Sequence, residues 1–253
     1  MTQLVGSVGR EGLNRKTDVR LVQGLLNNYK IPNINTPLLI DGDAGNKTIK
    51  RIEAFQSKVL NKKKPDGRVD PNGQTFKKLI NRPSSKFASA FKLSSDAIQL
   101  LHKIEGLATT PYDDQTGKDI TQWVKGATIG YGHLIRRYEW SLYKNGISEK
   151  QADKLYQSDM SPFEEKVSQS VTSKILQQEY DALVIFIFNI GRTGFSNSSV
   201  LKLVNNPGAN TSYDSLEDAW MVWNKSQGKV MRGLTNRRAA EWRIYSKGIY
   251  KGW

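Results

Sequence analysis

The sequence predicts a mainly helical α+β protein with two domains. At 253 residues the chain is longer than a typical single domain. Apolar residues recur at helical spacing along most of it, whereas the segment 110–133 carries a short β-like run with several glycines. Residues 1–86 hold 17 Lys and Arg against 7 Asp and Glu, and residues 87–253 hold 21 against 17. We therefore expect a basic N-terminal domain at 1–82, a linker at 83–89 and a larger helix-rich domain at 90–253.

The N-terminal domain is expected to contain three helices. Residues 18–30 form an amphipathic pattern that Thr17 can cap, a second pattern follows the turn at Asp41-Gly42, and a short third helix contains Phe76 and Leu79. The apolar stripes of the first two helices are Val19, Val22, Leu25, Leu26 and Tyr29, and Ile49, Ile52, Ala54 and Phe55.

A small unit occurs twice in this domain. Each copy consists of Asp-Gly, a few polar residues, a threonine and a helix, at Asp41–Thr48 and again at Asp66–Thr75, which indicates a pseudo-repeat. The first copy is not a calcium loop, because its sixth position is Asn46 and its twelfth is Ile52, where such loops have Gly and Glu. The lysine run 62–64 between the copies predicts a solvated loop, with contact to acidic wall polymer or lipid phosphate as the alternative.

The second domain follows Arg82-Pro83-Ser84-Ser85-Lys86, which has the composition of a linker. Ser95 can cap a helix that ends at Glu105, and Ser148 with Gln151 forms a capping box before another helix. Residues 176–190 form the most apolar helical pattern, and 215–223 and 234–245 are further amphipathic helices. With a small sheet around 110–133, these elements can bury a sizeable core.

Composition excludes several chemistries. The chain has no cysteine, and its two histidines, His102 and His133, are too few for a usual zinc site, so we expect no metal and no cofactor. The first residues lack the apolar core of a signal peptide, and no apolar run approaches the roughly 20 residues that span a bilayer. We therefore expect synthesis in the cytoplasm. The net charge of +14 favours an anionic partner, such as nucleic acid, anionic lipid or acidic wall polymer.

Two carboxylates stand out. Glu105 is expected in the last turn of its helix with Gly106 as the C-cap, where the helix dipole and an apolar face raise the pKa of a carboxyl and suit it to be a general acid. Asp114 lies in a polar segment and is expected to stay ionised, although Asp113 competes for the same role. Two acids whose pKa values are pulled apart are typical of glycoside hydrolysis.

The acids are followed by the string Thr128-Ile129-Gly130-Tyr131-Gly132-His133. Glu105-Gly106, Asp114 and this string together resemble the active-site signature of the phage-type lysozymes, glycoside hydrolase family 24. The resemblance implies a lysozyme-like domain in which Glu105 donates a proton and Asp114, with Thr128, positions a water. Thr128 lies fourteen residues after Asp114, whereas the family usually has about six, and Thr121 is the weaker alternative.

The resemblance covers nearly all of residues 95–250. It implies that His133 and Asp159 form a structural ion pair rather than a catalytic dyad. It also implies substrate contacts from Asn189, Tyr131 and Arg237, with Arg237 approaching Glu105 and Arg238 as its fallback. Capping a helix end is the alternative for Asn189.

The N-terminal domain resembles the three-helix peptidoglycan-binding domain of cell-wall hydrolases. The matching residues are Val22-Gln23, Leu25-Leu26-Asn27, Ile40-Asp41-Gly42, Thr48, Phe55-Gln56, Asp66-Gly67 and Thr75. The two resemblances together imply a modular phage endolysin, a muramidase that is made in the host cytoplasm and acts on peptidoglycan in the periplasm after release. They favour a monomer whose partner is bacterial peptidoglycan and not a specific nucleic acid.

Further alternatives stay open at this point. Anionic outer-membrane lipid is a second candidate partner, through the basic residues of the last helix and tail, although a solvated face explains them equally well. A binding protein without catalysis and a nucleic-acid-binding protein are the other function classes, and a tail-associated or secretion-system muramidase is the nearest rival enzyme. Inversion needs carboxyl groups roughly 6.5–9.5 Å apart, whereas about 5 Å indicates retention. The basic residues of the last helix and tail, which could contact lipid, are Arg237, Arg238, Arg243, Lys247 and Lys251.

Overall fold

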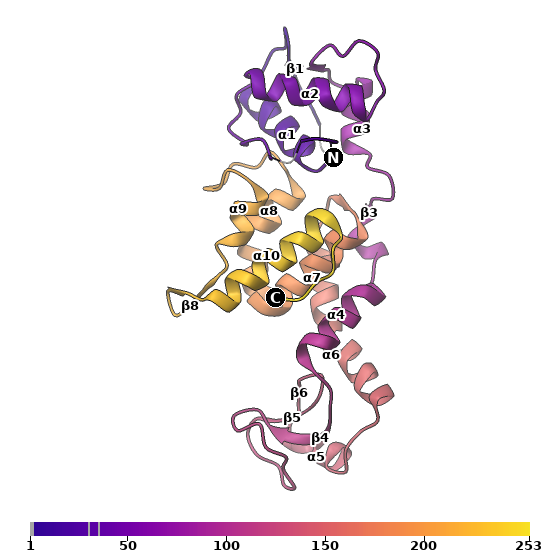
Figure 1. The fold of residues 1–253 in the computed structure, drawn as a ribbon, viewed down its shortest axis with the longest axis vertical. Coiled ribbons are helices and arrows are strands. Elements are labelled where there is room, and N and C mark those ends of the chain that lie inside the picture. Colours follow the sequence, from indigo (N-terminus) through magenta and orange to yellow (C-terminus); the bar gives the residue numbers. More distant parts are fainter. Residues whose placement is uncertain (1–2, 30, 35) are drawn as a thin grey trace.

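The computed structural model describes residues 3–29, 31–34 and 36–253 of the chain, and these are organised around two hydrophobic cores. One core is formed by residues between Leu4 and Leu79, and the other by residues between Ala88 and Tyr245. Three layers follow one another along the long axis (Figure 1): the first core, a body of helices and a lobe that contains a small sheet. The domain bounds expected from the sequence stay a prediction.

The first core is built by three helices, as the periodicity predicts, and by a two-stranded antiparallel sheet that the periodicity does not predict. Thr17 is not the cap of the first helix, because that helix starts at Lys16 and its N-cap position is Arg15, without a side-chain hydrogen bond. The predicted stripe is buried at Val19, Val22, Leu25 and Leu26. The elements are β1 (Val8–Gly9), α1 (Lys16–Asn27), α2 (Asn46–Lys58), β2 (Arg68–Val69) and α3 (Gln74–Ile80).

A buried glutamine organises each copy of the repeat. The Gln23 amide donates to Asp41 Oδ1 at 2.7 Å, to the Asp43 carbonyl and to Thr48 Oγ1, while its oxygen accepts from the Gly42 N–H. Gln56 makes the same four contacts in the second copy, to Asp66, the Arg68 carbonyl, Thr75 and the Gly67 N–H. Each glutamine comes from the helix that precedes its turn. The sequence repeat is therefore also a repeated hydrogen-bond pattern.

Replacing Gln56 by leucine is expected to lower the free energy of unfolding by at least about 1–3 kcal/mol. Gln56 is fully buried, and its loss leaves the Gly67 N–H and the Arg68 carbonyl without this partner away from water. Urea unfolding of the full chain measures the change. Gln74→Leu, at an exposed position of α3, is the matched control. Equal stability of the two variants would contradict the structural role of Gln56.

The second core is enclosed mainly by helices. A three-stranded antiparallel sheet in the order β4-β5-β6 lies at one end of this part of the molecule, where the sequence predicts it (Figure 1). The elements are β3 (Lys86–Phe87), η1 (Ala88–Ala90), α4 (Ser95–Glu105), β4 (Ala108–Asp113), β5 (Ala127–Gly130), β6 (His133–Leu134), η2 (Arg137–Glu139), α5 (Trp140–Tyr143), α6 (Glu149–Ser170), β7 (Lys174–Ile175), α7 (Gln177–Asn197), α8 (Ser199–Asn205), α9 (Leu216–Met221), β8 (Lys225–Ser226), β9 (Lys229–Val230) and α10 (Arg232–Lys247).

Most expected helices of this part are present, with small shifts at their ends. The capping box of Ser148 and Gln151 starts α6 as predicted. The apolar helix at 176–190 forms the first segment of α7, which breaks at Gly191, where φ is +79°. Ser95 is not the cap of α4, because Ser94 lies at the N-cap position and its hydroxyl accepts from the Ala97 N–H.

The two cores are joined by direct contacts. In the segment expected to be a linker, β3 pairs with β7 and Ala88 is buried in the second core. Arg82 forms an ion pair with Glu179 on α7. Arg20 of α1 donates to the carbonyls of Gly208 and Ala209 at 3.4 and 3.1 Å. Among the described residues, none of the helices has the length and apolar composition needed to cross a membrane.

Candidate active site

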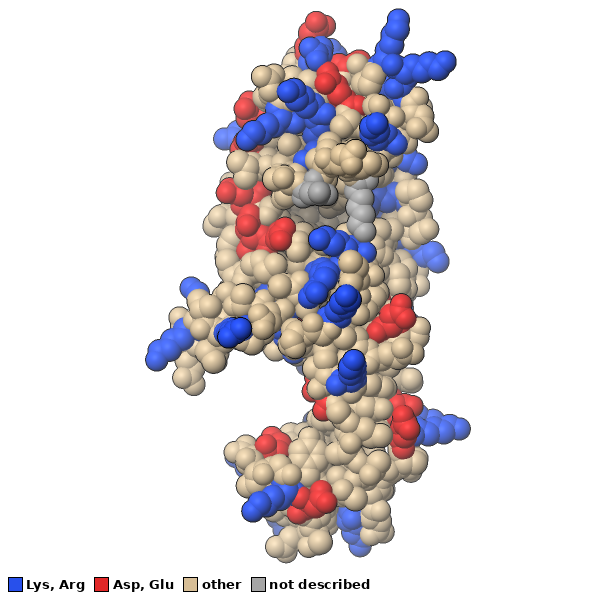
Figure 2. All heavy atoms as spheres, in the orientation of Figure 1, with Lys and Arg blue, Asp and Glu red and all other residues tan. Residues whose placement is uncertain are grey.

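The surface is deeply indented between the sheet lobe and the body of helices (Figure 2). The last residue of α4, Glu105, lies where that helix meets the lobe. A cavity of about 340 Å³ opens beside it and is also lined by Tyr112 and Asp119. The remaining lining residues are Gly106, Leu107, Ala108 and Gly117. The expected proton donor therefore borders a hollow large enough for part of a sugar chain.

Glu105 has the electrostatic environment that its position predicts. Helix α4 stops at Gly106, whose φ of +74° turns the chain toward β4. Removal of water from its surroundings raises the pKa of the Glu105 carboxyl above the ordinary value of 4.5, and the nearby Arg237 guanidinium opposes part of this rise. The residue is nevertheless exposed to solvent. Glu105 can therefore hold a proton to a higher pH than an ordinary glutamate and still reach a ligand.

Asp114 and Thr128 are held together by one carbonyl group. The Asp114 N–H donates to the Gly126 carbonyl at 3.1 Å, and the Thr128 hydroxyl donates to the same oxygen at 2.9 Å. Thr128 lies in the middle strand β5, opposite Tyr112 of β4. The extra residues between Asp114 and Thr128 therefore form a loop that returns to the sheet and brings the two residues side by side.

The structure also separates the roles of the neighbouring acids Asp113 and Asp114. The Asp113 carboxylate accepts from the Gln115 N–H at 3.1 Å and from the Thr116 hydroxyl at 2.9 Å, so it holds the turn after β4. The Asp114 carboxylate accepts no hydrogen bond from the residues that the structure describes. Asp114 is thus the acid available to a ligand.

Gly126 allows this arrangement, so Gly126→Ala is expected to reduce the peptidoglycan hydrolysis that the sequence resemblance implies by about 10²-fold. A methyl group there would lie 2.3 Å from Asp114 Oδ1, and φ is +104°, so both the carboxylate and the loop must move. A displacement of about 1 Å at a catalytic group can cost roughly 10²-fold in rate. Turbidity assays on purified peptidoglycan measure the loss. Gly228→Ala, also at positive φ but without a neighbour within 4 Å, is the matched control and should retain activity.

Glu105 and Asp114 both affect the pKa of one tyrosine, Tyr112. Burial raises the pKa of Tyr112, and the charges of Asp114 and Glu105 raise it further. Both carboxylates therefore lie near one side chain of β4. Tyr112 and Asp119 were not singled out as site residues by the sequence pattern. Asp119 reaches this place through a bridge to Tyr112 and a contact with Thr110, which nothing in the local sequence signals.

A second cavity, of about 240 Å³, is lined by Gly132. Gly132 lies next to Glu105, since a methyl group on it would be 3.9 Å from Glu105 Oε2. Tyr131 lines this cavity, but its ring stacks on His102 at 3.6 Å and its hydroxyl bonds Asp153, so the structure does not bring that hydroxyl to the acid pair. The other lining residues are His133, Leu134, Arg136, Tyr156, Asp159, Phe163 and Phe188.

The expected pair of His133 and Asp159 is present. His133 Nδ1 lies 2.9 Å from Asp159 Oδ2 and 3.0 Å from Oδ1. Because a carboxylate can only accept, the Nδ1–H donates a hydrogen bond to Asp159. The pair joins β6 to α6 and borders the second cavity. It therefore ties the sheet lobe to the long helix, as a structural ion pair does.

The predicted arginines of α10 have different places. Arg237 lies near enough to Glu105 to lower the pKa of that carboxyl. Arg238 is fully buried and donates to Glu241 at 2.9 Å and to the side-chain oxygen of Asn189 at 2.6 Å. Burial lowers the pKa of Arg238 to about 10, so it stays charged at neutral pH. Arg238 therefore orients the exposed Asn189 amide, and Arg237 is the arginine beside the acid.

No group of three or more His, Cys, Asp or Glu in the described part of the chain could hold a metal ion.

Comparison with known proteins identifies relatives for the second part of the chain. The model of the phage lysozyme family matches residues 102–241. The endolysin of Bacillus phage PZA is 33% identical over 160 residues, which cover 63% of this chain and 57% of that protein. The endolysin of Salmonella phage P22 is 31% identical over 152 residues, which cover 59% of this chain and 94% of that protein. The family match contains Glu105, Asp114, Thr128 and Arg237.

A solved structure agrees with these matches. The endolysin from Escherichia coli O157:H7 phage FAHEc1 superimposes with a TM-score of 0.50 at 27% sequence identity, covering 64% of this chain and 97% of that one. The chain spans little more than half the length of the two Bacillus phage endolysins that it matches.

Proposed function

Because the chain belongs to the phage lysozyme family, we propose that it is a muramidase that hydrolyses the β-1,4 bond between N-acetylmuramic acid and N-acetylglucosamine in peptidoglycan. One observation carries the proposal. Glu105, whose carboxyl has a raised pKa, borders a cleft together with the pair of Asp114 and Thr128 on the Gly126 carbonyl. A protonated acid near an ionised one is the arrangement that glycosidic cleavage requires.

Glu105 is proposed as the general acid. It protonates the oxygen of the scissile bond, so that the leaving sugar departs as a neutral alcohol. The cavity at Glu105 is lined on two sides by apolar or backbone surface from Leu107, Ala108 and Gly106. A sugar that enters it displaces water from the carboxyl, which keeps the proton on Glu105 until the transition state forms.

Asp114 and Thr128 are proposed to hold the attacking water. The carboxylate accepts a hydrogen bond from one O–H of the water, and the Thr128 oxygen accepts one from the other. The Thr128 hydroxyl meanwhile still donates its own hydrogen bond to the Gly126 carbonyl. Asp114 also stabilises the positive charge that develops on the sugar ring. We expect inversion at the anomeric carbon, because a water molecule rather than the carboxylate attacks this carbon.

Three further residues are proposed to contact the substrate. The Asn189 amide nitrogen is left free to donate to an N-acetyl or hydroxyl oxygen, because Arg238 occupies its oxygen. Arg237 faces the acid side of the cleft. Tyr131 contributes a wall of the second cavity, and its role in binding stays a prediction.

The N-terminal part is proposed to bind the cell wall and to make the protein a modular endolysin. Its basic surface suits acidic wall polymers, and a groove of about 920 Å³ runs between the 36–43 segment and α2. Lys and Arg side chains gather on this end of the molecule in Figure 2. We further propose that the protein acts as a monomer on periplasmic peptidoglycan after synthesis in the host cytoplasm, with anionic outer-membrane lipid as a second partner.

Product analysis tests the proposed activity. Purified peptidoglycan is digested in water enriched in ¹⁸O, and the released fragments are identified by mass spectrometry. We expect new reducing ends on N-acetylmuramic acid, each with one ¹⁸O atom from the attacking water. Reducing ends on N-acetylglucosamine, anhydro sugars without the label, or cleavage of amide bonds alone would each contradict the proposal.

A further inference from the structure

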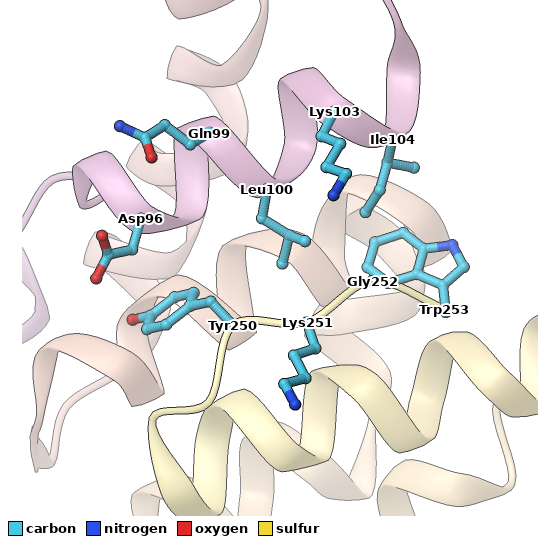
Figure 3. A pocket seen from close by; sticks show the side chains of 9 residues that line it. All are labelled: Asp96, Gln99, Leu100, Lys103, Ile104, Tyr250, Lys251, Gly252 and Trp253. Atoms are coloured by element: carbon cyan, nitrogen blue, oxygen red, sulfur yellow. The ribbon is translucent and has the colours of Figure 1, made fainter.

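The tail that follows α10 lies along α4, the helix that carries Glu105. Gly248 adopts a left-handed conformation at the end of α10, with φ of +64°. The Tyr250 hydroxyl then donates to Asp181 Oδ2 at 2.6 Å, and Asp181 also accepts from Ser94, the cap of α4. Figure 3 shows residues 250–253 opposite the α4 side chains, with the Trp253 ring close to Ile104. The tail is thus fixed at the start of α4 and reaches the end where Glu105 lies.

Trp253 covers one face of the arginine beside the proton donor. The centre of its ring lies 4.5 Å from the carbon of the Arg237 guanidinium, within the range of a cation–π contact. The ring packs against the second core. Arg237 Nε donates to Glu241 at 3.0 Å, whereas the contact of Nη2 with the Ile185 carbonyl is long, at 3.4 Å. Glu241 therefore fixes one edge of the guanidinium, and Trp253 fixes its plane.

Arg237 is the cationic group that acts on Glu105. Glu105 also raises the pKa of two tyrosines, Tyr112 from β4 and Tyr156 from α6, and Asp114 acts on Tyr112 as well. Burial raises the pKa of Glu105, and Arg237 holds that rise in check. The position of this guanidinium therefore influences how readily Glu105 gives up its proton.

We infer that Trp253 is a positioning residue for the reaction, which holds the Arg237 guanidinium at the distance from Glu105 that makes this glutamate an effective proton donor. The inference rests on the proposed function, in which Glu105 is the general acid. Without the ring, the guanidinium plane can rotate about the hydrogen bond from Arg237 Nε to Glu241. The two Nη atoms can then move toward solvent. Glu105 then loses a neighbouring positive charge, so its pKa rises and it becomes a weaker acid.

The test measures the Glu105 carboxyl itself and the activity, on the full chain. A ¹³C NMR titration, with the signal assigned by Glu105→Gln, gives the pKa of Glu105 in the wild type, Trp253→Ala, Trp253→Phe and Lys251→Ala. We expect Trp253→Ala to raise this pKa. At pH values below the pKa, where Glu105 is protonated in every variant, Trp253→Ala should lower kcat/KM by about two- to thirtyfold, the range that corresponds to the loss of a cation–π contact. Its kcat/KM should also fall off at a higher pH than that of the wild type.

Two control variants distinguish a loss of Arg237 positioning from a general loss of structure in the tail. Trp253→Phe retains a ring and should restore most of the activity and the pKa, whereas Lys251→Ala, an exposed position of the same tail, should change neither. In an Arg237→Met background, Trp253→Ala should cause no further shift.

An unchanged Glu105 pKa in Trp253→Ala, or an equal shift in Lys251→Ala, would overturn the inference. Should Trp253→Ala fail to fold, an unshifted Glu105 in Trp253→Leu would overturn it and a raised pKa would support it. A wild type that leaves peptidoglycan intact would refute the proposed function instead, and the titration would still decide whether Trp253 acts on Glu105.

Discussion

The Glu105→Gln variant is expected to lose peptidoglycan hydrolysis by at least roughly 10²–10⁴-fold, the usual contribution of a general acid. Glutamine has nearly the same shape as glutamate and can occupy the end of α4 unchanged, but it cannot donate a proton to the glycosidic oxygen. Because the substitution removes no packing, sedimentation of the variant with purified peptidoglycan should persist. Loss of turbidity of purified walls, followed at equal protein concentrations, measures the activity.

The matched control for this variant is Glu165→Gln, on the exposed side of α6. It makes the same chemical change far from the cleft and should retain full activity. A Glu105→Gln protein that cleared walls at a near-native rate would show that another group supplies the proton. The assignment of the acid would then be wrong even if the protein remained a muramidase.

The largest expected loss of stability comes from Arg238→Met. Arg238 and Glu241 are both fully buried, and Glu241 accepts from Arg237, Arg238 and the Trp220 indole. Removing one partner of a buried ion pair leaves a charge with less compensation and typically costs about 3–5 kcal/mol. Urea unfolding of the full chain should show a decrease of that order. Activity should fall as well, because the side-chain oxygen of Asn189 loses the hydrogen bond that it accepts from Arg238.

Arg232→Met is the control on the same helix. Arg232 is exposed at the start of α10, and replacements at such positions usually change stability by less than about 0.5 kcal/mol. If Arg238→Met unfolded at the same urea concentration as Arg232→Met, with an unchanged slope, the buried ion pair would not be a major source of stability.

The fold was predictable where a periodic pattern decided it. The stripes of α1 and α2, the capping box of α6 and the apolar segment of α7 repeat signals that depend on neighbours within one helix. The predicted helix ends were less accurate. Both Ser94 and Ser95 could cap α4 by their chemistry, and only the backbone geometry before the helix selects Ser94. The repeat in the N-terminal part was visible in the sequence, and Gln23 and Gln56 were among the residues that match the wall-binding resemblance. Their hydrogen bonds to each turn were not predicted, because each glutamine lies on the preceding helix.

In the candidate site, too, some features follow from the sequence and others depend on the folded structure. Position in the sequence was enough to nominate Glu105, Asp114 and Thr128, which remain proposed catalytic residues. The Gly126 carbonyl that joins two of them depends on how the loop folds back, and the nearness of Asp119 depends on a strand bridge. Trp253 lies 16 residues after Arg237, and no local pattern relates the two. Contacts made by loops and tails are set by the packed structure rather than by periodicity.

The most direct test of the account is the dependence of kcat/KM on pH, compared with the titration of Glu105 in the same protein. A general acid acts only while protonated, so activity should persist below the pKa of Glu105 and be lost as the pH rises through it. Burial raises this pKa. We predict that the decline in activity and the Glu105 titration coincide, both above the ordinary value of 4.5. A carboxyl that titrates at or below that value while activity persists to neutral pH would contradict the account.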